Sequence, residues 1–225
     1  MLRHRGYQVH IYDRYDRIGG LLTYGIPGFK LEKSIVERRG QLLIDGGVQF
    51  HLGVDIGGET SFADIRAKHD AILVATGVYK ARDIAAPGSG LDGIVPALEY
   101  LTVSNRKSLG DDVAAFDSGA LNADGKDVVV IGGGDTAMDC VRTAIRQKAK
   151  SVSCLYRRDR ANMPGSQREV QNAEEEGVVF KWLSAPQAFL GDNKVRSVQA
   201  QRIHLGQPDA TGRQVPEVIN GSAHE

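Results

Sequence analysis

The feature that most constrains this sequence is an apolar run that leads directly into three glycines. Residues 128–131 are Val-Val-Val-Ile, four β-branched or branched aliphatic residues without polar alternation, a pattern typical of a strand buried on both faces of a parallel sheet. The six residues that follow match the pattern G-x-G-x-x-A and are Gly132, Gly133, Gly134, Asp135, Thr136 and Ala137. In this pattern the first glycine makes a tight turn, the second lets backbone approach a pyrophosphate, and the last small residue lets a helix pack on the strand. The segment therefore predicts a strand, a dinucleotide-binding loop and a helix, the alternative being an ordinary glycine-rich turn of any α/β protein.

The next apolar run indicates which dinucleotide would bind. Residues 151–156 predict a second strand, which ends in Arg157 and Arg158. Arg157 lies 157 − 137 = 20 residues beyond Ala137, where a dinucleotide-binding fold places an acid for the ribose of NAD or an arginine for the 2′-phosphate of NADP. Because guanidinium groups bind phosphate through paired, charge-assisted hydrogen bonds, the sequence favours NADP(H). The alternative is a solvated basic turn.

The residues after the arginines extend the same alternation. Ser166 and Glu169 form an S-x-x-E pattern that predicts a capping box, and the helix that follows ends near Gly177. Residues 178–182 resume a strand. The order from residue 126 is thus β-α-β-α-β, half of a doubly wound α/β sheet. Shorter, antiparallel strands are expected at residues 195–204 and 214–219.

The first hundred residues contain part of a second dinucleotide-binding pattern. Residues 7–13 predict a strand that ends in Asp13, an acid of the kind that binds a ribose hydroxyl, but only eight residues precede Val9. A preceding strand, glycine loop and helix need about 25–30 residues, so we expect the chain to be a piece of a longer protein. Further elements are expected as a helix at 31–45, a strand at 48–54, a helix at 61–68 and a buried strand at 70–77.

Composition excludes several other classes of protein. Lys plus Arg and Asp plus Glu both number 28, so the net charge is zero and no broad field attracts nucleic acid or an anionic membrane. No apolar run approaches the ~18 residues that span a bilayer, and the N-terminus lacks the apolar stretch of a secretory signal. Cys140 and Cys154 are the two cysteines, too few for a disulfide framework, which favours a cytoplasmic protein. The six histidines show no metal-ligand spacing, so no metal site is expected.

Three long strings and one short one in this sequence resemble the small (beta) subunit of NADPH-dependent glutamate synthase. They are residues 13–30, 75–77, 132–139 and 156–166. The resemblance extends over essentially the whole chain, and more distantly the chain is similar to the flavin-containing part of dihydropyrimidine dehydrogenase and related iron–sulfur flavoproteins. It implies two Rossmann-like folds, an FAD domain interrupted by an NADPH domain. Residues 1–87 would be a partial FAD-binding domain, and residues 88–225 an NADPH-binding domain that is incomplete at its C-terminus.

The resemblance also implies which residues bind each cofactor. For FAD they are Asp13 at the ribose, Gly20, Leu21 and Lys30 along the flavin, Val54 and Ile56 near the adenine, and Thr76 and Gly77 beside the pyrophosphate. For NADPH they are Gly132 to Ala137 at the pyrophosphate and Arg157 with Arg158 at the 2′-phosphate.

The implied activity is that of an electron-input flavoprotein oxidoreductase in glutamate biosynthesis and ammonia assimilation. A hydride would pass from NADPH to FAD, and electrons would continue to iron–sulfur centres held by an N-terminal domain outside these residues. The partner would be the glutamate synthase large (alpha) subunit, which makes glutamate from glutamine and 2-oxoglutarate. No catalytic acid or base is expected, because the cofactors perform the chemistry. The alternatives are another NADPH:acceptor iron–sulfur flavoprotein and a nucleotide-binding fragment without turnover, and the isolated chain is expected to be inactive.

Overall fold

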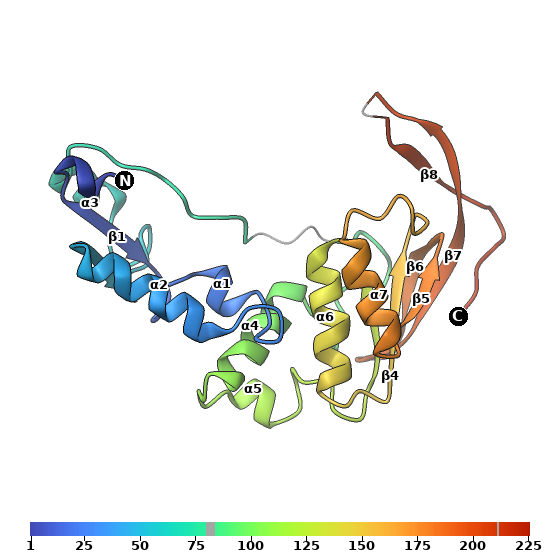
Figure 1. Ribbon diagram of the computed structural model, residues 1–225. Helices are drawn as coiled ribbons and strands as arrows, with labels where there is room; N and C mark the ends of the chain where they lie inside the picture. The colour runs from blue at the N-terminus through green and yellow to red at the C-terminus, as the bar shows by residue number, and fades with distance from the viewer. Residues whose placement is uncertain (80–83, 211) are drawn as a thin grey trace. The chain divides into compact units, whose positions relative to one another are not determined.

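The computed structural model describes residues 1–79, 84–210 and 212–225 and divides into two compact units, Met1–Lys80 and Ala81–Glu225 (Figure 1). We call them the first unit and the second unit. The division that the sequence predicts between an FAD-binding and an NADPH-binding domain, after residue 87, remains a prediction, because compactness alone does not assign a cofactor to either part.

The first unit is built on a two-stranded parallel sheet. Strands β1 (Val9–Asp13) and β2 (Val48–Leu52) pair with Val9 opposite Val48. The connecting segment contains α2 (Lys33–Asp45), which has a buried glycine, Gly40, at its middle. A Cβ on Gly40 would lie 3.2 Å from the Ile18 side chain, so the glycine allows the helix to approach that residue closely. The remaining helices of this unit are the 3₁₀ turn η1 (Arg3–Arg5), α1 (Leu21–Tyr24) and α3 (Phe62–Lys68).

The buried strand predicted at residues 70–77 is wrong. Residues 71–79 have no regular secondary structure, and the side chains of Leu73 and Val78 are 86% and 83% exposed. A parallel strand requires hydrogen bonds from a neighbouring strand, and among the described residues the sheet of the first unit contains only β1 and β2. The segment is apolar, as the prediction required, but no described strand of the first unit pairs with it.

The second unit contains the predicted alternation of strands and helices. Strands β3 (Asp127–Ile131), β4 (Ser151–Tyr156) and β5 (Val179–Trp182) form a parallel sheet in that order. Helices α6 (Asp135–Arg146) and α7 (Gln167–Glu175) are the connections. The β-α-β-α-β prediction is thereby confirmed, and α4 (Ala97–Ser108) and α5 (Ala114–Asp117) precede it in the chain.

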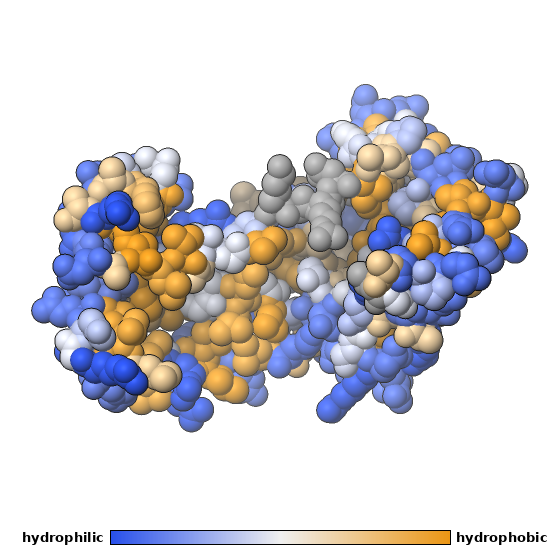
Figure 2. Space-filling model, turned by 90° about the horizontal axis from the view of Figure 1, so that it is seen from above, coloured by the Kyte–Doolittle hydropathy of each residue, from blue (hydrophilic) through white to orange (hydrophobic). Residues whose placement is uncertain are grey.

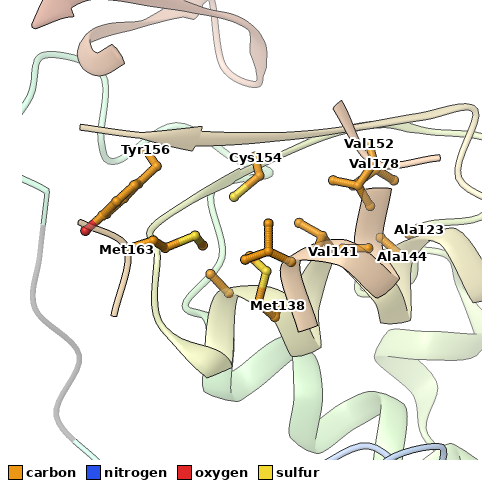
Figure 3. Close-up of a cluster of buried hydrophobic side chains, with 12 residues drawn as sticks. Ala123, Met138, Val141, Ala144, Val152, Cys154, Tyr156, Met163 and Val178 are labelled. Atoms are coloured by element: carbon orange, nitrogen blue, oxygen red, sulfur yellow. The ribbon is translucent and has the colours of Figure 1, made fainter. Parts of the chain in front are cut away.

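The core of the second unit lies between α6, α7 and the parallel sheet (Figure 3). Met138, Val141 and Val170 are completely buried, and Cys154 projects from β4 toward them. Burial of each such side chain contributes about 1.5–3 kcal/mol. Cys140, on α6, is 3% exposed. Both cysteines are thus core residues, and burial raises the pKa of each thiol to about 12.

The predicted capping box at the start of α7 does not form. Ser166 is the residue that precedes the helix, but its hydroxyl makes no capping hydrogen bond. The carboxylate of Glu169 instead accepts a hydrogen bond from Arg142 of α6, with 2.7 Å between Nη1 and Oε2. A strong ion pair between two helices therefore takes the side chain that a capping box requires.

An antiparallel sheet follows the parallel one. It consists of β6 (Ser184–Gly191), β7 (Val195–Pro208) and β8 (Gln214–Val218), paired in that order. Two of these strands were predicted as antiparallel, whereas β6 was not predicted. Apolar side chains reach the surface in both units (Figure 2), and on α2 they include Leu42 and Leu43, which are 56% and 48% exposed.

Candidate dinucleotide-binding site

The glycine loop connects the carboxyl end of β3 to the first turn of α6. Gly132 has a φ of +148°, and its amide donates to the carbonyl of Leu155 on the adjacent strand at 3.1 Å. Gly133 is buried beneath the ring of Tyr156, which a Cβ at that position would overlap. A side chain is thus excluded at Gly133 by the packing of the protein itself.

The third glycine borders open space. A Cβ on Gly134 would meet no atom within 4 Å, and Gly134 is the residue that precedes α6. Helical geometry leaves the amides of Asp135 and Thr136 without intrahelical acceptors, and both residues are exposed. Free amides, a helix N-terminus and room beside a glycine are what a pyrophosphate requires, so these residues fit the dinucleotide that the sequence predicts.

The structure separates the two arginines that the sequence treats as a pair. Arg157 is exposed, and within the described ranges it forms no hydrogen bond or ion pair. Arg158 is only 9% exposed, and its Nε donates to the carbonyl of Gln214 on β8 at 3.1 Å. Because β3 and β4 are parallel, with Ile131 opposite Leu155, the glycine loop and the arginines follow adjacent strand ends at one edge of the sheet.

The loop from Asp159 to Ser166 is attached to the glycine loop. The amide of Gly165 donates to the carbonyl of Gly133 at 3.0 Å, and the amide of Ser166 donates to Oδ1 of Asp135 at 3.1 Å. Sequence reasoning found no role for this loop beyond its resemblance to known proteins, although it contains a proline and a glycine in the string Met-Pro-Gly-Ser.

In the first unit, Asp13 closes β1 and begins a turn. Its Oδ1 accepts a hydrogen bond from the amide of Tyr15 at 3.0 Å, and its carbonyl accepts one from the amide of Val54 at 3.0 Å. The structure thus brings together two of the predicted FAD residues. Ile56 and Lys30 are exposed, and Ile56 forms an isolated bridge with Thr60.

An aromatic side chain connects the two predicted FAD glycines of the first unit. A Cβ on Gly20 would lie 3.9 Å from the hydroxyl of Tyr79, and one on Gly77 would lie 3.4 Å from its ring. The Arg14 guanidinium lies 4.1 Å from the centroid of the same ring. Burial is the main cause that raises the pKa of Tyr79, and the nearby Tyr15 raises it further. Leu21 begins α1 directly after Gly20, while Thr76 is exposed in the irregular segment.

Sequence reasoning missed a histidine cluster in the first unit. His10 Nδ1 lies 3.0 Å from His51 Nε2, with the two rings nearly parallel, and the His69 ring centroid lies 5.1 Å from that of His10. The Tyr12 hydroxyl is 3.1 Å from His69 Nε2. These residues are distant in the sequence, so their spacing gave no signal. In the part of the chain that the structure describes, no group of three or more His, Cys, Asp or Glu side chains could hold a metal ion.

Comparison with known proteins agrees with this geometry. The parallel sheet and its glycine loop define a dinucleotide-binding fold, and the chain belongs to the family described as pyridine nucleotide-disulphide oxidoreductase, which matches residues 2–210. Within this class the chain is a homologue of the glutamate synthase [NADPH] small chain: it is 69% identical to that of Azospirillum brasilense over 98% of this chain and 46% of the relative. It is 43% identical to the Escherichia coli protein of the same description, over 100% of this chain and 48% of the relative.

The solved structures support the fold. FprA from Mycobacterium tuberculosis superposes with a TM-score of 0.81 at 18% identity, covering 96% of this chain and 61% of that one. A second structure of FprA, in complex with NADPH, superposes with a TM-score of 0.80. This chain spans about half the length of the curated relatives that it matches. Across the described residues, no helix combines the length and apolar character needed to cross a membrane.

Proposed function

We propose that the chain is part of the electron-input flavoprotein subunit of a glutamate synthase, which oxidises NADPH and passes the electrons through FAD to iron–sulfur centres. The observation that carries the proposal is 69% identity to a glutamate synthase [NADPH] small chain over 98% of this chain. The glycine loop and the exposed Arg157 support it with a physical basis for binding a phosphorylated dinucleotide. NADPH supplies the hydride and FAD accepts it when both are bound.

The residues of the second unit bind and orient the nicotinamide nucleotide in this proposal. The backbone from Gly132 to Ala137 approaches the pyrophosphate, with the open side of Gly134 facing it and the first turn of α6 donating its free amides. Arg157 pairs with the 2′-phosphate. Arg158 is 9% exposed, and its Nε already donates to the carbonyl of Gln214, so it is less able to bind a phosphate. We therefore propose that Arg157, and not Arg158, binds the 2′-phosphate of NADPH.

The residues of the first unit line the FAD in the same proposal. The carboxylate of Asp13 binds a ribose hydroxyl, a role that suits its place at the end of a parallel strand. Gly20 and Gly77 permit close approach of the cofactor beside Tyr79. The remaining proposed contacts are Leu21, Lys30, Val54, Ile56 and Thr76.

The other participants lie outside these 225 residues. The chain has two cysteines, both buried, whereas a [4Fe–4S] cluster takes four thiolate ligands, so we propose that other residues hold the iron–sulfur centres. The proposed partner is the large subunit, which forms glutamate from glutamine and 2-oxoglutarate, and the proposed location is the cytoplasm. By itself the chain is expected to bind NADPH without oxidising it.

The proposal is tested by titrating the 225-residue chain with NADPH and NADH in a calorimeter. We expect NADPH to bind more tightly, and Arg157→Ala to weaken NADPH at least tenfold while leaving NADH nearly unchanged, since a charged hydrogen bond is worth about 1.5–3 kcal/mol. Arg168→Ala, at an exposed arginine of α7, is the matched control and should change neither affinity. Equal losses for both nucleotides in Arg157→Ala would contradict the assignment.

One alternative has the same architecture and a different electron acceptor. The chain is also 33% identical to the NADP(+)-dependent formate dehydrogenase subunit beta of Moorella thermoacetica over 97% of this chain. Affinity capture of the full-length protein from its own cells distinguishes the two. Recovery of a glutamate synthase large subunit supports the proposal, and recovery of another dehydrogenase subunit supports the alternative.

A further inference from the structure

The loop from Asp159 to Ser166 is fitted to the glycine loop at close range. Gly165 is buried, and a Cβ there would lie 3.1 Å from the carbonyl oxygen of Gly133. The Gly165 amide donates to that same oxygen at 3.0 Å. A Cβ at position 165 would require the two loops to move apart by a few tenths of an ångström, so this contact favours glycine at that position.

The second attachment uses a carboxylate in an unfavourable place for a phosphate site. Asp135 is the first residue of α6 and stands beside the free amides that would receive a pyrophosphate. A negative charge there is favourable for the helix dipole but repels a bound diphosphate. The Asp135 carboxylate nevertheless has a structural role, because its Oδ1 accepts a hydrogen bond from the Ser166 amide at 3.1 Å.

The far side of the loop is held by a hydrogen-bonded turn within the loop and by an ion pair with α7. Asp159 Oδ1 accepts hydrogen bonds from the amide and the side chain of Asn162, both at 2.8 Å. Arg160 forms an ion pair with Glu174 of α7 at 2.7 Å. The segment that begins just after Arg158 is therefore fastened to α7 at one side and to the start of α6 at the other.

We propose that Asp135 is a positioning residue, which fastens the Asp159–Ser166 loop to the glycine loop and so holds the chain that follows Arg157 and Arg158 against the first turn of α6. This inference rests on the proposed function. A dinucleotide with a 2′-phosphate must contact both places at once, whereas a small fragment contacts one. Asp135 thereby favours binding of NADPH, which contacts both places, although its negative charge repels the diphosphate of that ligand.

Two substitutions separate the acceptor from the charge. Asp135→Asn keeps an oxygen acceptor for Ser166 and removes the charge, so NADPH should bind as tightly as before or up to severalfold more tightly. Asp135→Ala removes both, and NADPH should bind at least tenfold more weakly. The affinity for 2′-AMP, which reaches only the Arg157 side, should change less than twofold in either variant. Asp124→Asn and Asp124→Ala, at an exposed aspartate of the same unit, are the matched controls.

Hydrogen exchange of the loop gives a readout that does not depend on a nucleotide. The Ser166 amide should exchange faster in Asp135→Ala than in the unmodified chain, and at an unchanged rate in Asp135→Asn. Equal NADPH affinities for the two variants, or equal loss for NADPH and 2′-AMP, would overturn the positioning role. If the unmodified chain binds no dinucleotide, the proposed function fails and the positioning role falls with it. If the unmodified chain binds NADPH but the two variants do not differ from each other as expected, only the positioning role is overturned.

Discussion

Neighbouring glycines in the loop after β3 carry different constraints. Gly133 lies beneath the Tyr156 ring, and Gly134 faces open space. We expect Gly133→Val to unfold or strongly destabilise the second unit, because a branched side chain would overlap a buried ring. Gly134→Val should fold normally and lose NADPH binding, because the side chain fills the space that the pyrophosphate needs. Circular dichroism reports folding and calorimetry reports NADPH binding. A folded Gly134→Val variant with unchanged NADPH affinity would contradict the assignment of this loop.

The residue Lys148 adopts a backbone conformation that suits glycine better. It follows α6 with a φ of +64°, and its amide and carbonyl both form backbone hydrogen bonds, with Ile145 and Gly125. A side chain in the left-handed region costs about 1 kcal/mol or more. Lys148→Gly should therefore raise the free energy of unfolding by about 0.5–1 kcal/mol, measured with urea. Lys150→Gly, nearby and without a positive φ, serves as the control and should bring no gain. A loss of stability in Lys148→Gly would show that its side chain contributes more than the strain costs.

At the scale of elements, prediction succeeded where a segment carries its own pattern. Strand β3 is apolar from Val128 to Ile131, β4 is rich in apolar residues and ends in Cys-Leu-Tyr, and α6 places its apolar residues at helical spacing. Local sequence therefore indicates each of these elements. Residues 70–77 have an equally apolar sequence, but they form no strand because strand formation depends on a paired neighbour. Strand β6 contains Pro186 and lacks regular alternation, so its pairing with β7 could not be read locally.

The contact of α6 with α7 and with Glu176, which directly follows α7, is expected to weaken at low pH. Arg142 forms ion pairs with Glu169 and Glu176, each at 2.7 Å, and Arg146 also reaches Glu176, at 2.8 Å. Burial by itself would raise the pKa of Glu176, but the hydrogen bonds and charges of Arg142 and Arg146 outweigh it, and the pKa is lowered. A lowered carboxyl pKa stabilises the fold above the ordinary value of about 4.3, and that stability is lost as the pH falls through the lowered value.

The variant Glu176→Gln tests this contribution. At pH 7 it should lose about 1–3 kcal/mol in free energy of unfolding, because the amide Oε1 still accepts from Arg142 but no longer carries the negative charge that pairs with a guanidinium only 10% exposed. At a pH well below 4 the difference from the unmodified chain should shrink. Urea unfolding at the two pH values measures it, with Glu175→Gln, at an exposed neighbour, as the control. A difference that stays constant with pH would show that the ion pair is not responsible.

At the scale of the whole molecule, the candidate sites were predicted unevenly. The glycine loop was predictable because the pattern is contiguous. The separation of Arg157 from Arg158 was not, because the burial of Arg158 results from β8, whose Gln214 lies 214 − 158 = 56 residues further along the chain. The contact of Tyr79 with Gly20 was also not predictable from local sequence. Nor was the histidine cluster, whose members come from β1, from β2 and from the residue after α3. Such groupings arise from tertiary packing, and no local spacing encodes them.

Because its thiols are buried, the unfolding of the second unit can be followed by thiol labelling. Both cysteines and the single tryptophan, Trp182, lie between residues 81 and 225, and Trp182 stacks on Phe180 beside the core that contains Cys154. A thiol whose pKa is raised to about 12 reacts with a disulfide reagent only after it is exposed. We expect the labelling of both cysteines and the change in tryptophan fluorescence to share one midpoint in urea. Two separate midpoints would contradict a shared core. Since the first unit contributes no thiol and no indole, its opening is invisible to both signals and must be followed by circular dichroism or by hydrogen exchange.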